Sequence, residues 1–203
     1  MSVIILDLGL SNLKSLENSL NRIDVKFKIS NDKDVIQRAR KIIIPGVGSF
    51  PDAIDSLKKR NLIDLLSNLK KTNRSLLGIC LGMQILADIG NENIKKKGLS
   101  LIPGEVKKIP QKLVNHIPNI GWCPVKIDKK HFIFEGIPTQ SFFYFVHSYY
   151  YSCNEKFIYG TSGDFFKFPS VICKDNFVGV QFHPEKSYDY GLKLLSNFCK
   201  NDR

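Results

Sequence analysis

The chain has 203 residues, of which 43% are hydrophobic and 24% are charged, as in an ordinary globular protein. We therefore expect a single domain over residues 1–203 with a sizeable core. No apolar run is long enough to cross a bilayer, which argues against a membrane protein.

The net charge of +11 does not by itself indicate a nucleic-acid-binding protein. The lysines are scattered, and the run at 95–97 has no aromatic-interleaved basic stretch or binding motif beside it. The five cysteines form no Cys-x-x-Cys pair, which argues against a disulfide framework or a zinc site. The N-terminus leads into a strand without a basic segment, so we expect a cytoplasmic protein without a signal peptide.

Strands alternate with helices in the first half of the chain. Strands are expected at 3–8, 25–30, 41–44 and 75–79, and helices at 12–23, 32–39, 51–71 (one or two helices) and 83–89. From Gly104 the pattern changes to short strands at 105–109, 125–127, 142–152, 159–161, 171–174 and 178–182, before a helix at 191–200. The sequence predicts an α/β fold: an open, mostly parallel sheet with helices on both faces and β-rich additions in the C-terminal half.

The β-branched run at 42–44 ends in the turn Pro45-Gly46-Val47-Gly48, which precedes a helical pattern. Backbone N–H groups in such a turn are free to bind an oxyanion where the strand stops. An ordinary strand–helix turn explains these residues equally well.

The stretch 76–84 has the pattern of a nucleophile elbow, in which a strand, a sharp turn and a helix follow one another. Gly78 and Gly82 remove side chains that would clash in so tight a turn. Cys80 would then stand at a helix N-terminus, where free N–H groups favour the thiolate. A buried core cysteine after a strand is the alternative.

A base and a carboxylate follow about a hundred residues later, in the stretch 179–187. Pro184 biases His183 toward extended backbone, in which residues two apart point to the same side. Glu185 can therefore orient His183, and His183 can take the proton of Cys80. A surface turn with an incidental histidine is the alternative, but the coincidence of the two patterns favours a cysteine nucleophile.

Together these motifs resemble class I glutamine amidotransferases. The matching segments are Gly-Ile-Cys-Leu-Gly-Met-Gln at 78–84, Pro-Gly-Val-Gly at 45–48 and Gln-Phe-His-Pro-Glu at 181–185. Asp-Leu-Gly-Leu-Ser-Asn-Leu at 7–13 and Phe-Tyr-Phe-Val-His-Ser-Tyr at 143–149 are most similar to the glutaminase subunits of imidazole glycerol phosphate synthase. The resemblance extends from Val3 to Phe198.

The resemblance implies a glutaminase whose Cys-His-Glu triad releases ammonia from glutamine without a metal or other cofactor. The triad would be Cys80, His183 and Glu185, and the oxyanion would be held by N–H groups near Val47 and Gly48 and by that of Leu81. Further implied contacts to the glutamine amino-acid moiety come from Gln84, Ser148 and Tyr149. His147 is expected to be structural, and His116 and His131 to be loop residues.

Ammonia released into water is protonated and lost, so the resemblance also implies a (β/α)₈-barrel synthase partner in a heterodimer. Asn12, Lys14 and Trp122 fall where the family builds that interface. Asn119 and Cys123 depart from the usual Pro-His-Met-Gly-Trp-Asn motif, which leaves two acceptors open. One is the precursor of imidazole glycerol phosphate in histidine biosynthesis, and the other is a surface-polysaccharide or flagellar sugar that receives an amidino group.

Two further alternatives stand beside these. The chain can be a non-catalytic scaffold of the same fold, against which the intact Cys80, His183 and Glu185 argue. It can also be a stand-alone cysteine hydrolase acting on peptides, against which the Pro-Gly-Val-Gly turn and the partner-facing segment argue.

Overall fold

The structure, a computed structural model, describes residues 3–9, 13–113 and 116–201. The larger sheet consists of β1 (Val3–Leu6), β2 (Phe27–Ser30), β3 (Lys41–Gly46), β4 (Ser75–Cys80), β8 (Asn119–Ile127), β9 (Ser141–His147), β11 (Ile158–Ser162), β12 (Phe168–Lys174) and β13 (Phe177–Val180). The smaller sheet consists of β5 (Ile89–Gly90), β6 (Lys96–Lys97), β7 (Glu105–Lys108) and β10 (Tyr149–Ser152).

The α-helices in the described ranges are α1 (Leu13–Arg22), α2 (Lys33–Arg38), α3 (Phe50–Lys59), α4 (Ile63–Ser67), α5 (Leu81–Gln84) and α6 (Tyr188–Lys200). Short 3₁₀ turns lie at η1 (Asn68–Lys71), η2 (Gln111–Leu113), η3 (Phe132–Phe134), η4 (Glu155–Phe157) and η5 (Pro184–Lys186). The region predicted as one or two helices at 51–71 is therefore two helices and a 3₁₀ turn.

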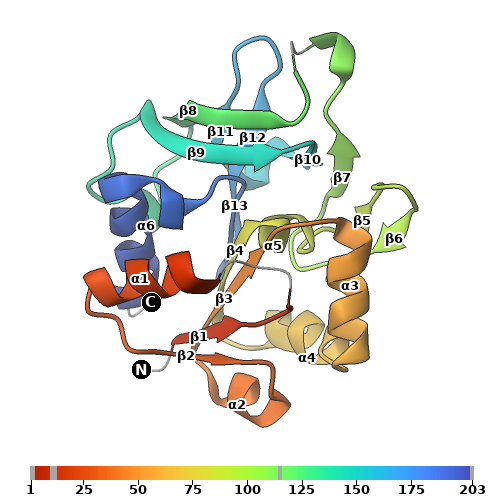
Figure 1. Cartoon of the computed structure of the whole chain (residues 1–203), viewed down its shortest axis with the longest axis vertical. Coiled ribbons are helices and arrows are strands. Elements are labelled where there is room, and N and C mark those ends of the chain that lie inside the picture. The colour runs from red at the N-terminus through yellow and green to blue at the C-terminus, as the bar shows by residue number, and fades with distance from the viewer. Residues whose placement is uncertain (1–2, 10–12, 114–115, 202–203) are drawn as a thin grey trace.

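The strand order of the larger sheet is β2-β1-β3-β4-β13-β12-β11-β8-β9. The pairs from β2 to β13 are parallel, and those from β13 to β9 are antiparallel. This confirms the predicted α/β sheet with β-rich additions in the second half of the chain. The antiparallel strands β8 and β9 lie at the opposite end of the molecule from α2 (Figure 1).

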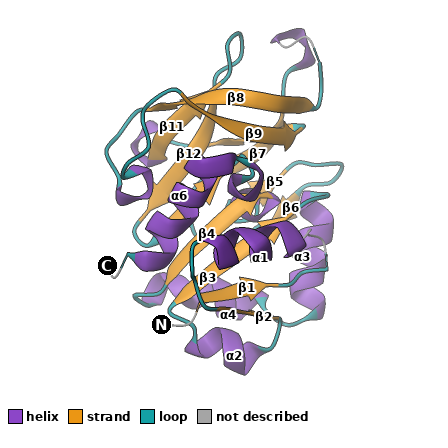
Figure 2. Cartoon of the chain, turned by 60° about the vertical axis from the view of Figure 1, so that its left-hand side comes forward, coloured by secondary structure: helices purple, strands orange, loops and turns teal. Residues whose placement is uncertain are grey.

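The apolar strands of the parallel half are buried on both faces, which is why they read as continuous hydrophobic runs. Ile4 and Ile42 face a cluster that contains residues of α3 and α4, whereas Ile5 and Ile43 face a cluster with α1 and α6. In Figure 2, α1 and α6 lie side by side over the same face of the sheet.

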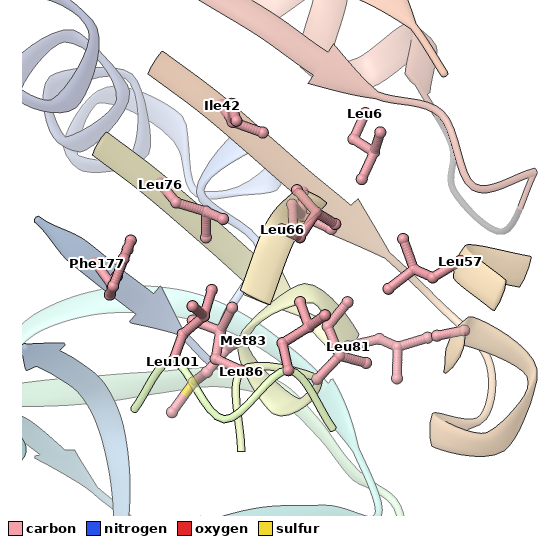
Figure 3. Packing of buried hydrophobic residues seen from close by; sticks show 14 of the residues in the cluster. Leu6, Ile42, Leu57, Leu66, Leu76, Leu81, Met83, Leu86, Leu101 and Phe177 are labelled. Carbon is pink, nitrogen blue, oxygen red and sulfur yellow. The ribbon is translucent and has the colours of Figure 1, made fainter. Parts of the chain in front are cut away.

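The first of these clusters extends to the segment that follows Cys80. Leu81, Met83 and Leu86 pack there with side chains of the parallel strands and of α3 and α4 (Figure 3). The residues after Cys80 are thus anchored in the core, and this fixes the position of the turn that carries the sulfur.

A buried lysine holds the C-terminus of α6 against β3. Lys41 is only 4% exposed, and its Nζ donates to the carbonyl oxygens of Phe198, Cys199 and Asn201. A cation at this end of a helix is favourable because the last carbonyls carry partial negative charge. Since α6 begins shortly after Glu185, this contact also anchors the segment that carries His183.

The helix predicted at 83–89 is wrong: α5 has four residues and ends at Gln84. The carbonyls of Ile85 and Leu86 accept hydrogen bonds from the backbone of residues 99, 101 and 102, so they are not available to continue the helix. Ile89 instead enters β5, which pairs with β6 and β7.

The strand predicted at 142–152 is two strands, divided at Ser148. β9 pairs with β8 in the larger sheet, and β10 pairs with β7 in the smaller one. The side chain of His147 bonds to the carbonyl of Tyr149 over 2.8 Å across the break.

Candidate active site

Cys80 ends β4 in a strained backbone conformation, with φ 53° and ψ −109°. Non-glycine residues rarely adopt a positive φ, and such strain is typical of functional turns. A Cβ on Gly78 would lie 2.4 Å from the carbonyl oxygen of Gly82, and one on Gly82 would lie 1.8 Å from that of Ile44. Both glycines are therefore required for the close packing of this turn, as the sequence predicts.

His183 and Glu185 lie together beyond the end of β13, with Nδ1 and Oε1 2.7 Å apart. Their side chains are 3% and 8% exposed. The backbone of His183 is fixed at both ends, because its N–H donates to the Tyr144 carbonyl over 2.9 Å and its carbonyl accepts from Ser187 Oγ over 2.6 Å. Nothing in the sequence distinguishes Ser187, and only the fold shows its contact with this segment.

Burial lowers the pKa of His183, but its hydrogen bonds to Cys80 and Glu185 and their charges outweigh burial and raise the pKa above its usual value. The pairing of Nδ1 with Glu185 leaves Nε2, which is buried, for the interaction with Cys80. A raised pKa means that this histidine holds its proton when the sulfur is negative. The geometry therefore suits a thiolate–imidazolium pair.

A cavity of about 270 Å³ opens beside the sulfur. It collects most of the residues that the sequence predicts for the site, namely Cys80, Val47, Gly48, Leu81, Gln84, Ser148 and Tyr149. Residues 47 and 48 follow β3, and residues 148 and 149 lie at the break between β9 and β10. Separate segments thus form one wall, because the carboxyl ends of parallel strands meet at one edge of the sheet.

The cavity is also lined by Glu92, which sequence reasoning missed. It is the only carboxylate among the described lining residues, and its Oε2 accepts the N–H of Phe50 over 2.7 Å. Burial raises the pKa of Glu92, the Phe50 N–H lowers it, and the charge of Asp52 raises it, for a net increase. Nothing in the local sequence distinguishes this residue, because its position depends on contacts with α3.

Gln84 is 4% exposed, and its amide nitrogen makes two hydrogen bonds. Nε2 donates to the carbonyl of Tyr149 and to Oε1 of Gln181, each over 3.1 Å. An amide group has two N–H donors, so both are used within the protein. Gln84 can therefore offer the cavity only its carbonyl oxygen.

His147 is buried, and both ring nitrogens have partners. Nδ1 donates to the Tyr149 carbonyl, so Nε2 accepts from Asn119 Nδ2 over 3.0 Å. Burial lowers the pKa of His147 to about 4, and the Tyr149 contact opposes this effect only in part. The ring is thus neutral and structural, as expected. His116 lies in an exposed loop, and His131 packs against Phe132 and Tyr159.

The residues predicted for the partner interface are only partly placed. Asn12 lies outside the described residues, whereas Lys14 is exposed on α1. Trp122 is 44% exposed and stacks on Tyr188, with ring centroids 5.0 Å apart. Asn119 and Cys123 alternate with Trp122 along β8, so their side chains point to the opposite face of the strand.

The comparisons with known proteins agree with these motifs. The family model for the class I glutamine amidotransferase domain matches residues 4–201. The chain belongs to the class I glutamine amidotransferases. It is 40% identical over 196 residues to the imidazole glycerol phosphate synthase subunits HisH of Bacillus cereus and Bacillus anthracis. Each alignment covers 97% of this chain and 93% of the relative.

Solved structures share the fold of this amidotransferase. A putative GMP synthase glutaminase-fold protein from Thermoplasma acidophilum has a TM-score of 0.75 at 19% identity, covering 98% of this chain and 92% of that one. PurLQS from Thermotoga maritima has a TM-score of 0.74 at 13% identity, covering 98% and 97%. In the described part of the chain, no helix is long and apolar enough to cross a membrane. Likewise, the described His, Cys, Asp and Glu side chains form no group of three or more that could hold a metal ion.

Proposed function

We propose that this chain is the glutaminase subunit of an imidazole glycerol phosphate synthase, which supplies ammonia for histidine biosynthesis. The observation that carries the proposal is the convergence of Cys80, His183 and Glu185 beside one cavity. The near full-length similarity to HisH proteins supports this acceptor over the others.

The chemistry follows from the three side chains. The Cys80 thiolate attacks the side-chain amide carbon of glutamine, and N–H groups of Leu81 and of the turn at Val47 and Gly48 stabilise the oxyanion. His183 gives its proton to the departing nitrogen, and ammonia leaves. Water, deprotonated by the same histidine, then hydrolyses the thioester to glutamate. Glu185 keeps the imidazole oriented throughout.

The cavity suits the amino-acid moiety of glutamine. Glu92 is placed to pair with the α-ammonium group, and the carbonyl oxygen of Gln84 can accept a further hydrogen bond from it. The backbone at Ser148 and Tyr149 would bind the same end of the substrate. The amide end would then lie next to Cys80.

Ammonia must reach its acceptor before it is protonated, so we propose a heterodimer with a barrel-type synthase partner. The outer side of β8 is a candidate docking face, because Ile120 and Trp122 are 60% and 44% exposed there and Trp122 stacks on Tyr188. Lys14, on the helix that follows β1, would border the same interface. We further propose that residues 1–203 act as one domain in the cytoplasm, where the described cysteines, all free, stay reduced.

Reconstitution tests the proposal. The chain is mixed with the barrel subunit of an imidazole glycerol phosphate synthase, and the product is followed with glutamine or with ammonium as nitrogen source. We expect glutamine to support product formation only when this chain is present. Glutamine hydrolysis without transfer to this acceptor would instead favour the amidino-sugar pathway, and no hydrolysis at all would favour a scaffold.

A further inference from the structure

We propose that Gln181 is a positioning residue of this active site, which stabilises the Cys80 thiolate by donating an N–H to the sulfur. The proposal rests on the proposed glutaminase function and assigns a role to a residue outside the Cys80, His183 and Glu185 set. The contact with the sulfur, the orientation of the amide and the surroundings of the sulfur each support it.

Gln181 is fully buried, one residue after β13. Its Nε2 lies 3.7 Å from Cys80 Sγ, within hydrogen-bonding distance for a sulfur acceptor. Because Gln181 and His183 are two residues apart on nearly extended chain, both side chains reach the same region. The sulfur therefore has an amide donor in addition to the imidazole.

The orientation of the Gln181 amide follows from a neighbouring carbonyl. The backbone oxygen of Tyr149 can only accept, so Gln84 must present its nitrogen to it, over 3.1 Å. The same nitrogen of Gln84 faces Gln181, which must therefore present Oε1, also over 3.1 Å. This leaves Nε2 of Gln181 directed at the sulfur. The donor is fixed by a chain of hydrogen bonds, and an isolated flexible amide would lack that restraint.

The sulfur needs such a donor because its other neighbours do not all favour the thiolate. The carbonyl of Val146 lies 3.8 Å from Sγ, where it accepts from the thiol and would repel a thiolate. The helix after Cys80 has four residues, so its N-terminal N–H groups provide a much smaller dipole than the helix to residue 89 that the sequence predicts. The N–H of Gln181 acts in the opposite direction to the Val146 carbonyl.

The same chain of hydrogen bonds also reaches the wall of the cavity. The Tyr149 carbonyl accepts from His147 as well as from Gln84, and His147 in turn accepts from Asn119. The orientation of the donor at the sulfur and the position of the substrate-facing loop thus depend on one shared acceptor. We infer that correct folding of this loop is needed for full activation of Cys80.

The test measures the rate of alkylation of Cys80 by iodoacetamide against pH, with the modified peptide quantified by mass spectrometry so that the other cysteines do not interfere. Gln181→Met keeps the length of the side chain and removes the N–H. We expect the pH midpoint of Cys80 alkylation to rise by about one to two pH units, since a hydrogen bond to a charged group is lost. Gln37→Met, at an exposed glutamine of α2, should leave the midpoint unchanged.

An unchanged or lowered midpoint in a folded Gln181→Met protein would overturn the proposal. If that variant does not fold, Gln181→Leu also lacks the N–H and is judged by the same criterion. A residue with a merely structural role would change the stability of the protein but not this midpoint. Because alkylation requires no glutamine, the result is independent of the reconstitution experiment, and each proposal can fail without the other.

Discussion

Asn119 donates from Nδ2 to Nε2 of His147 over 3.0 Å, and so fixes the neutral Nδ1–H form of the buried imidazole. The pKa of His147 is about 4, compared with the usual 6.5. In the sequence, Asn119 appears only as a departure from a family motif on the partner-facing segment. In the structure it points away from that surface and supports the wall of the candidate glutamine cavity.

The lowered pKa of His147 predicts a pH dependence of stability. Between pH 6.5 and about 4 the unfolded chain binds a proton at this histidine and the folded protein does not. Stability should therefore fall as pH decreases through this window, by about 3 kcal/mol at most from this group. Denaturant unfolding at several pH values measures the effect.

His147→Gln removes the titrating group, and the other ionisable groups cancel in the comparison with wild type. The difference in unfolding free energy between the two proteins should shrink as the pH falls from 6.5 to about 4. A constant difference over this range would show that His147 titrates alike in both states.

Glu185→Gln should leave the fold intact and reduce glutamine turnover by about 10³–10⁴-fold, because the imidazole loses the carboxylate that orients it and stabilises its charge. The effect should appear in kcat with KM nearly unchanged, and the pKa of His183 should fall. Glu155→Gln, at an exposed glutamate of η4, is the matched control. Near wild-type kcat in Glu185→Gln would exclude the proposed role.

The parallel half of the fold was predictable because its strands are buried runs that alternate with amphipathic helices. The elbow at Cys80 and the pairing of His183 with Glu185 were predictable because short local motifs define them. The length of α5 was not, since an apolar stretch such as 83–89 fits either a buried helix or an irregular core segment. Its true path is set by hydrogen bonds from residues 98–102, which no local pattern shows.

Contacts between distant segments explain the other misses. Glu92 reaches the cavity because the Phe50 N–H holds it, and Ser187 matters because it joins the His183 segment to β9. Gln181 belongs to a motif that the sequence singled out, and its spacing of two residues from His183 was an available signal. Its contact with the sulfur, however, requires the position of β4 beside β13.

Gly82→Ala should destabilise the protein by about 3 kcal/mol, because the new Cβ would overlap the Ile44 carbonyl at the elbow. Gly160→Ala is the control, since its Cβ would meet neighbours only at 3.2 Å or beyond, and we expect a loss of about 1 kcal/mol or less. Chemical unfolding of both variants gives the comparison. Equal losses would mean that the elbow is less tightly packed than the geometry indicates.

We predict that the isolated chain is nearly inactive on glutamine and that an acceptor-loaded barrel partner activates it. Val47 is β-branched and stiff, so the peptide before Gly48 can rest with its carbonyl toward the site, which costs one oxyanion donor, or about 10²–10³ in rate. Gly48 has φ +104° and open space around it, which allows that peptide to rotate. Val47→Gly should therefore raise the activity of the isolated chain. Full activity of the isolated wild-type chain would contradict this gating.

The central claim is that Cys80 attacks glutamine. The most direct measurement is glutamate release from glutamine by the chain in complex with its barrel partner, compared between wild type and a folded Cys80→Ala protein. We expect loss of about 10⁴-fold or more in the variant, while exogenous ammonium still supports the synthase reaction of the complex because only ammonia supply is broken. Glutamate release by Cys80→Ala at a rate near that of wild type would contradict the account.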